Sequence, residues 1–120
     1  MMVLDASALL AFLQGEEGAD RVEAALLDGY VSAANWSEVA QKVLARDADW
    51  QLTATLLHSY GLTIEPVSQQ DAEVAASLWQ RGSGLSLADR LCLALGERLS
   101  VPVLTADKAW GKSEQVHQIR

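Results

Sequence analysis

This sequence has almost no cysteine and no long apolar segment. The single cysteine, Cys92, excludes an internal disulfide bond, which is typical of a protein in a reducing cytoplasm. No run of 18 or more apolar residues occurs, so we expect no membrane-spanning helix. The first residues carry no basic segment, and Asp5 interrupts the apolar stretch there, so no secretory signal is predicted. The sequence therefore predicts a cytoplasmic protein without membrane association.

Basic side chains are also scarce. Nine Lys and Arg stand against 16 Asp and Glu, and the formal net charge is −7. Taken alone, this charge argues against a nucleic-acid binder, because phosphate contacts need Lys and Arg. The distribution is uneven: residues 1–80 hold three basic and twelve acidic side chains, and residues 81–120 hold six and four. Any phosphate contacts are therefore expected in the last third. The acidic first part would repel RNA, meet a basic partner or simply keep the chain soluble.

What is present is an alternation of short apolar runs with longer helical patterns. The chain has 120 residues, half of them apolar, which fits one compact domain over residues 1–120. The apolar runs predict strands at 2–4, 30–32, 62–64, 101–104 and 116–119. The helical patterns cover 7–13, 19–27, 36–45, 50–60, 68–80 and 86–99. Such alternation predicts an α/β fold with a mainly parallel sheet.

Four acidic residues lie near the expected ends of strands or starts of helices. Asp5 follows the first strand, and Asp107 follows the strand at 101–104. Glu38 is expected in the opening turn of the helix after the second strand, and Asp89 in the first turn of the helix that begins at Ser86. Strand ends and the following helix starts share one edge of a parallel sheet. We therefore expect the four carboxylates to meet in one crevice.

Each carboxylate also has a purely structural interpretation. The pairs Asn35–Glu38 and Ser86–Asp89 fit the capping-box pattern at a helix start. Asp5 and Asp107 fit as helix N-caps. Capping explains each residue singly, but four carboxylates at corresponding ends of elements exceed what capping requires.

A crevice of four carboxylates favours a divalent cation. Like charges a few ångström apart raise one another's pKa, and a cation removes this conflict. Carboxylate oxygens are hard ligands that suit Mg²⁺ or Mn²⁺. Such ions polarise phosphoryl oxygens and activate water for attack on a phosphodiester. The residues themselves therefore indicate metal-assisted phosphoryl chemistry.

Four segments carry a resemblance to a known family. They are VLDASALL at residues 3–10, NWSEV at 35–39, LSLAD at 85–89 and VLTAD at 103–107. In order and spacing they resemble PIN-domain proteins, most closely the VapC-like toxins of type II toxin–antitoxin pairs. The likeness covers essentially the whole chain.

The resemblance implies a fold, an activity and partners. The fold is a three-layer α/β/α sandwich with a central parallel sheet. The activity is an Mg²⁺- or Mn²⁺-dependent endoribonuclease that uses metal-activated water on RNA. The chain is expected to form a homodimer and to be held inactive by a small antitoxin that covers the active site. DNA would be contacted only indirectly, through the antitoxin.

The resemblance also implies roles for individual residues. Asp5, Glu38, Asp89 and Asp107 stand where the family has its catalytic and metal-binding acids, and Asp5 and Asp89 match its most direct metal ligands. Two neighbouring hydroxyl residues, Ser7 and Thr105, are expected to orient carboxylates or a metal-bound water.

Two other functions remain open at this point. One is a catalytically idle PIN-like module that acts only by binding a partner. The other is a receiver-type phosphoacceptor domain, which needs an adjacent acidic pair after the first strand, where this chain has Asp5 alone. Arg90 and Lys108 each follow a candidate acid and either contact phosphate or lie on the surface.

Overall fold

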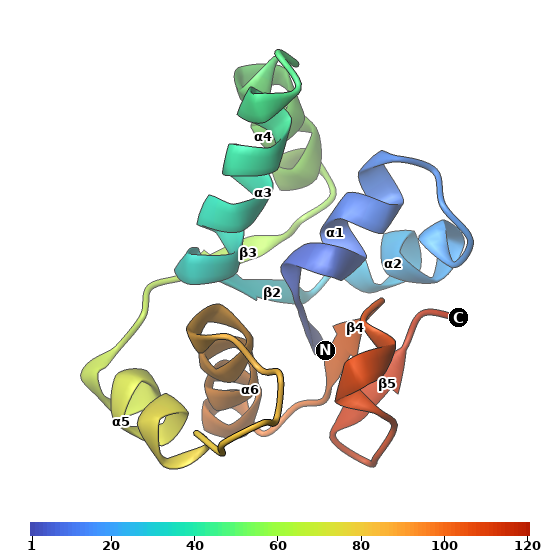
Figure 1. Cartoon of the computed structure of the whole chain (residues 1–120). Helices are drawn as coiled ribbons and strands as arrows, with labels where there is room; N and C mark the ends of the chain where they lie inside the picture. The colour runs from blue at the N-terminus through green and yellow to red at the C-terminus, as the bar shows by residue number, and fades with distance from the viewer.

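A single parallel sheet forms the centre of the computed structural model, which describes all 120 residues (Figure 1). Its strand order is β3-β2-β1-β4-β5, and every neighbouring pair is parallel. The strands are β1 (Met2–Leu4), β2 (Gly29–Ser32), β3 (Thr63–Glu65), β4 (Val103–Thr105) and β5 (Val116–Gln118). Val3 of the central strand pairs with Tyr30 on one side and with Val103 on the other. The mainly parallel α/β sheet predicted from the sequence is confirmed.

Helices cover both faces of this sheet. They are α1 (Ala6–Leu13), α2 (Ala19–Leu26), α3 (Ala33–Ala45), α4 (Trp50–Ser59), α5 (Gln69–Ser77) and α6 (Leu87–Leu99), with a short 3₁₀ helix η1 (Lys108–Trp110). In Figure 1, α1 to α4 lie above the sheet, and α5 and α6 lie below it. The fold is therefore the predicted three-layer α/β/α sandwich.

The alternation of side chains along β1 explains why two helical layers form. Leu4 belongs to a large buried cluster with residues of α1, α2 and α3 on one face. Val3 points to the other face and packs with Cys92 and Leu95 of α6 and with Val103. Both Val3 and Leu4 are fully buried, as expected for a strand covered on both sides.

The contact between α6 and the sheet is unusually close. A Cβ on Gly96 of α6 would lie 2.8 Å from Cγ2 of Val103, closer than side-chain carbons approach one another. Glycine therefore lets α6 lie directly on β4. The helix is only partly enclosed, because Leu87 at its start is 58% exposed. No helix of the structure has the length and apolar character needed to cross a membrane.

An ion-pair cluster fixes the position of α6 against its neighbours. The Arg98 guanidinium donates to both carboxylate oxygens of Asp71 at 2.8 and 3.1 Å, and it lies 3.6 Å from a Glu65 oxygen. Burial raises the pKa of Asp71, but the hydrogen bonds from Arg98 and Ser68 outweigh it, so the pKa lies below its ordinary value. The last turn of α6 is thereby tied to the start of α5 and to β3.

Some predicted boundaries are wrong. Helix α3 begins at Ala33, not at residue 36, because the Ser32 hydroxyl accepts a hydrogen bond from the Ala34 N–H and caps it. The strand predicted at 101–104 begins at Val103, because the Val101 N–H closes the end of α6 on the Gly96 carbonyl. The helix predicted to reach residue 80 ends at Ser77.

The strand order bears on one of the alternative functions. Receiver domains have the doubly wound order 2-1-3-4-5. This chain has the order 3-2-1-4-5. The receiver-type interpretation is therefore wrong.

Candidate active site

Asp5 occupies the end of β1 and the N-cap of α1. Its Oδ1 accepts hydrogen bonds from the Ala8 N–H and the Ser7 hydroxyl, both at 2.8 Å. Its Oδ2 accepts from the Thr105 hydroxyl at 2.6 Å. Burial raises the pKa of Asp5 from 3.8 to about 6, since these hydrogen bonds offset burial only in part and the nearby Asp89 charge raises it further. The buried carboxylate is therefore poised to be stabilised by a cation.

Ser7 and Thr105 connect Asp5 to the segment after β4. The Ser7 hydroxyl accepts a hydrogen bond from the Ala106 N–H at 2.9 Å, and the Thr105 hydroxyl accepts from the Asp107 N–H at 3.0 Å. Because each hydroxyl donates to Asp5 and accepts from this segment, the carboxylate and the Asp107 backbone are fixed relative to one another. The two hydroxyl residues thus stand where the sequence predicts orienting groups.

Glu38 extends from the second turn of α3, not from the opening turn. Asn35, one turn earlier, donates from Nδ2 to Glu38 Oε1 at 2.8 Å and to the Ala88 carbonyl at 3.4 Å. The prediction that Asn35 caps α3 is wrong, because Ser32 takes that position. The buried Asn35 instead holds the Glu38 carboxylate and joins α3 to the start of α6.

Asp89 and Asp107 both cap helices, as the structural interpretation predicts. Asp89 Oδ2 accepts from the Ser86 N–H at 2.9 Å, and the Ser86 hydroxyl accepts from the Asp89 N–H at 3.1 Å, which completes a capping box. Asp107 Oδ1 accepts from the Ala109 N–H at 2.9 Å at the start of η1. Each cap uses only one of the two carboxylate oxygens.

Capping therefore leaves acceptor capacity in the site. Oε2 of Glu38, Oδ1 of Asp89 and Oδ2 of Asp107 accept no hydrogen bond from the protein. All four acids line one cleft of about 220 Å³, together with Ala6, Ser7, Leu10 and Lys42. The structure thus brings the predicted acids to one place, at the carboxyl ends of β1 and β4.

The acids share a cleft without closing into a tight cluster. No three acidic, histidine or cysteine side chains form a ready-made metal site. The fully buried Cys92 thiol lies beneath the cleft: burial raises its pKa, and the Asp5, Asp89 and Glu38 charges raise it further. Cys92 is therefore a small core residue, as its place in an apolar helix indicates.

The donor set fits a hard divalent cation. Carboxylate and hydroxyl oxygens face the cleft, without histidine or thiolate ligands. Ionising Asp5 is costly because of burial and the Asp89 charge, and a cation in the cleft would reduce this cost. The unbonded oxygens of Glu38, Asp89 and Asp107 are available to it.

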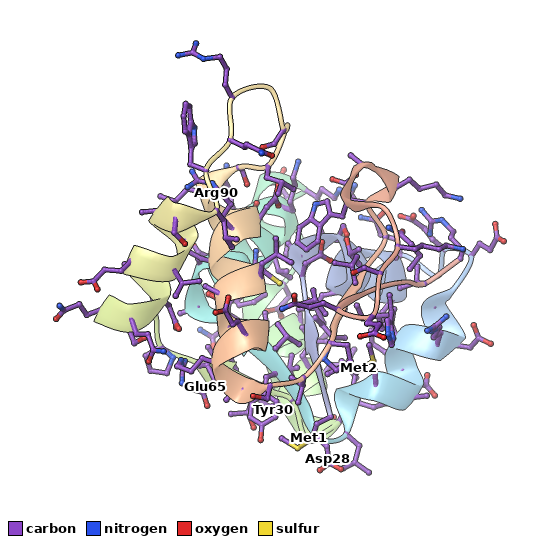
Figure 2. All side chains as sticks on the ribbon, turned by 90° about the horizontal axis from the view of Figure 1, so that it is seen from below. Met1, Met2, Asp28, Tyr30, Glu65 and Arg90 are labelled. Atoms are coloured by element: carbon purple, nitrogen blue, oxygen red, sulfur yellow. The ribbon has the colours of Figure 1, made fainter.

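Two cationic side chains near the acids, Arg90 and Lys42, lie differently from the sequence-based expectation. Arg90 does not reach the cleft, because its guanidinium donates to the Ala75 carbonyl at 2.8 Å and joins α6 to α5. Figure 2 shows Arg90 near the upper end of α6, beside α5. Lys42, which the sequence reasoning missed, lines the cleft. Its position four residues after Glu38 on α3 is the signal that indicates a shared helix face.

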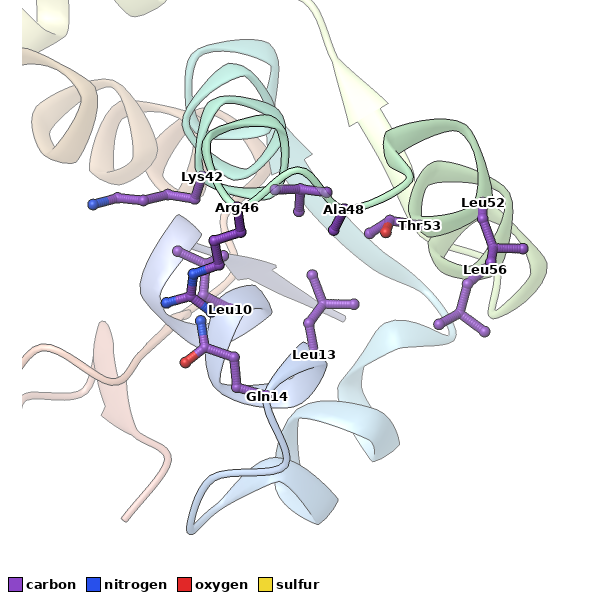
Figure 3. Close-up of a pocket in the computed structure, with 10 residues that line it drawn as sticks. Leu10, Leu13, Gln14, Lys42, Arg46, Ala48, Leu52, Thr53 and Leu56 are labelled. Carbon is purple, nitrogen blue, oxygen red and sulfur yellow. The ribbon is translucent and has the colours of Figure 1, made fainter.

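An apolar groove adjoins the cleft (Figure 3). It has a volume of about 300 Å³ and runs between α1, α3 and the start of α4. Leu13, Leu52 and Leu56 contribute apolar side chains to it. Leu10 and Lys42 line both the groove and the cleft. A chain lying in the groove would therefore reach the carboxylates.

The sheet order and the acidic cleft together define an α/β protein with its site at the carboxyl edge of a parallel sheet. The chain belongs to the PIN domain family, whose family model matches residues 2–113. It is 34% identical over 115 residues to a VapC ribonuclease of Mycobacterium bovis and to ribonuclease VapC42 of Mycobacterium tuberculosis. These alignments cover 86% of this chain and 88% of each relative.

Solved structures show the same fold. A toxin–antitoxin complex from Klebsiella pneumoniae contains a chain that superposes with a TM-score of 0.83 at 22% identity. That match covers all of this chain and 98% of the other. The sarcin-ricin loop cleaving toxin VapC20 of Mycobacterium tuberculosis superposes with a TM-score of 0.71 at 17% identity, over 95% of this chain and 98% of that one.

Proposed function

We propose that this protein is a divalent-metal-dependent endoribonuclease that acts as the toxin of a toxin–antitoxin pair in the cytoplasm. The observation that carries the proposal is the cleft in which four carboxylates meet, three of them with an oxygen that no protein group occupies. The named ribonucleases among its relatives support RNA as the substrate. The reaction is hydrolysis of an RNA phosphodiester bond.

The metal would be held by Asp5 and Asp89, with Glu38 and Asp107 completing the site directly or through water. Mg²⁺ or Mn²⁺ supplies, when bound, positive charge for the phosphate oxygens and a more acidic water. Ser7 and Thr105 keep Asp5 in one orientation through their hydrogen bonds. Asn35 does the same for Glu38. Lys42 provides a cation at the wall of the cleft for a substrate phosphate.

The antitoxin is proposed to bind the groove of Figure 3. An apolar segment suits Leu13, Leu52 and Leu56, and the groove leads into the acidic cleft at Leu10 and Lys42. A cationic side chain at the end of such a segment would pair with the carboxylates and exclude the metal. The fold shared with a chain of a toxin–antitoxin complex supports such a partner. Homodimer formation is part of the proposal and is measured by light scattering.

The test is cleavage of total cellular RNA by the purified protein free of antitoxin. Wild type is compared in Mn²⁺, in Mg²⁺ and in chelator with Asp5→Asn, and with the exposed Asp47→Asn as a control for loss of one negative charge. Discrete metal-dependent products are expected from wild type and Asp47→Asn but not from Asp5→Asn. A fully active Asp5→Asn protein would contradict the assignment. No cleavage by a folded protein would favour the catalytically idle binding module.

A further inference from the structure

A concentration of positive charge lies at the β5 edge of this acidic protein. Two adjoining hollows, of about 170 and 250 Å³, share Lys112 and Gln118 as lining residues. Their cationic side chains are Arg21, Lys108, Lys112 and Arg120, with His117 beside them, and no acidic residue lines either hollow. We call these hollows the basic trough. A hollow lined by one sign of charge attracts ligands of the opposite sign.

Most of this charge is not used within the protein. The side chains of Arg21, Lys108 and Lys112 form no ion pair and donate no hydrogen bond. The cations of the three ion pairs in the protein are Arg98, in two of them, and Arg120. Arg120 is partly engaged, since it donates to the Glu17 carbonyl at 2.7 Å and lies 3.5 Å from a Glu16 oxygen. The exposed Lys108 and Lys112 are therefore free to contact a ligand.

The backbone that carries the two lysines is held in place. The buried Gln118 side chain donates from Nε2 to the Asp107 carbonyl at 2.9 Å and to the Gly111 carbonyl at 2.8 Å. These two bonds span η1 from one end to the other. The Ser113 hydroxyl accepts from the backbone N–H groups of Gln115 and Val116 at 3.1 and 3.0 Å. A fixed backbone lowers the ordering cost of binding a ligand.

The trough begins where the carboxylate cleft ends. Asp107 lines the cleft, and the next residue, Lys108, lines the trough. Gln118 binds the Asp107 carbonyl from the trough side. A strand that places one phosphate among the carboxylates would therefore carry its neighbouring phosphates across η1 to Lys108 and Lys112.

We propose that the basic trough binds the phosphate backbone of the RNA strand on one side of the bond that is cleaved. This inference rests on the proposed ribonuclease function and adds a binding surface to it. The trough favours a nucleic acid over a protein: Val116 is the one apolar residue that lines it, whereas protein interfaces have apolar cores. Polar and cationic groups are what position a phosphate backbone.

The test measures RNA binding in chelator, where no metal-dependent cleavage occurs. The probe is a fluorescein-labelled 20-nucleotide single-stranded RNA of random sequence, and anisotropy gives Kd from 50 to 400 mM KCl. Wild type is compared with Lys112→Gln, with the double variant Lys108→Gln/Lys112→Gln, and with Arg81→Gln. Arg81 is an exposed cation on the connection between α5 and α6 and serves as the matched control.

We expect the slope of log Kd against log salt to fall by about 0.7 for Lys112→Gln and about 1.4 for the double variant. Taking equal affinities of the two proteins at 1 M salt, this difference in slope makes the double variant bind RNA about 25-fold more weakly than wild type at 0.1 M salt. Arg81→Gln should match wild type. Slopes and Kd values equal to the control would overturn the proposal. So would unchanged RNA binding together with lost binding of a polyglutamate peptide, which would assign the trough to an acidic protein.

Failure of this proposal is distinguishable from failure of the nuclease. If the protein binds RNA through the lysines but does not cleave it in Mn²⁺, the proposed trough is supported and the proposed nuclease activity is contradicted. If the protein cleaves RNA but its Kd and KM are unaffected by Lys112→Gln, the nuclease activity is supported and the proposed trough is contradicted. In an active enzyme, Lys112→Gln is expected to raise KM and leave kcat unchanged, because the trough contacts phosphates away from the reacting bond.

Discussion

Replacing Asp5 with asparagine should stabilise the metal-free protein while abolishing its proposed activity. The pKa of Asp5 is raised by burial from 3.8 to about 6. Between these two pH values the folded protein holds a proton that the unfolded chain has released. Wild type therefore loses stability as the pH rises through this window, and an asparagine at the same position does not.

The size of the effect follows from the shift. Each pKa unit corresponds to about 1.4 kcal/mol, so the ionised Asp5 costs about 3 kcal/mol above pH 6. Asparagine keeps one acceptor oxygen for the Ala8 N–H, and its amide group can donate to the hydroxyls of Ser7 or Thr105, which would have to rotate. Allowing about 1 kcal/mol for this rearrangement, we expect a net gain of about 2 kcal/mol at pH 8.

Urea unfolding in chelator at pH 4 and pH 8 measures this difference. The gap between Asp5→Asn and wild type should be small at pH 4 and about 2 kcal/mol at pH 8. Saturating Mg²⁺ should narrow or reverse it, since a ligand at 100 times its Kd stabilises the wild type by about 2.7 kcal/mol. Asp47→Asn controls for the loss of one surface charge. A gap that is equal at both pH values, or a less stable asparagine variant at pH 8, would refute the role assigned to the buried charge.

Three other substitutions test parts of the site and the fold. Asn35→Ala removes the hydrogen bond that holds the Glu38 carboxylate and should lower Mn²⁺ affinity or the rate of cleavage by about 10- to 100-fold. A metal titration measures this loss, and a thermal melt of the same variant checks that its fold is intact. Arg98→Met should cost about 2 kcal/mol in urea unfolding at pH 7. Because the pKa of Asp71 is lowered from 3.8, this loss should shrink as the pH falls below that value, and a loss independent of pH would contradict the ion pair. Gly29→Ala places a Cβ 2.6 Å from the Ala25 carbonyl oxygen and should lower the free energy of unfolding by about 1–3 kcal/mol. The exposed Gly82 has a positive φ and no neighbour within 4 Å of an added Cβ, so Gly82→Ala should report backbone strain alone.

The sequence was sufficient for the order of the elements and for the meeting of the acids. Short apolar runs mark buried parallel strands, and the carboxyl ends of such strands share an edge, which brings Asp5 and Asp107 together. The capping boxes at Ser68 and Ser86 were also predictable, because the pattern of residues three apart is local. The assignment of Asp89 to both a cap and the cleft shows that the two interpretations are compatible.

Features that depend on neighbours distant in the sequence were not predictable. Asn35 looked like a cap because nothing local reveals that Ser32 ends β2 and starts α3 without a loop. Arg90 looked available to phosphate because its acceptor, the Ala75 carbonyl, lies on another helix. The oxygens left free on Glu38, Asp89 and Asp107 could not be foreseen either, since they depend on which oxygen each cap or amide uses.

The bond between Asp5 and Thr105 joins residues 100 positions apart, and it sits at the centre of the site. A ribosome that adds about 5–20 residues each second needs roughly 5–20 seconds to travel between them. During that interval the growing chain has its first acid but lacks the strand that orients it, as well as Asp107, Lys108 and Lys112. The proposed site is therefore incomplete until the segment after β4 has been synthesised. The late pairing of β4 with β1 thus delays assembly of the proposed nuclease site until residue 105 has been added.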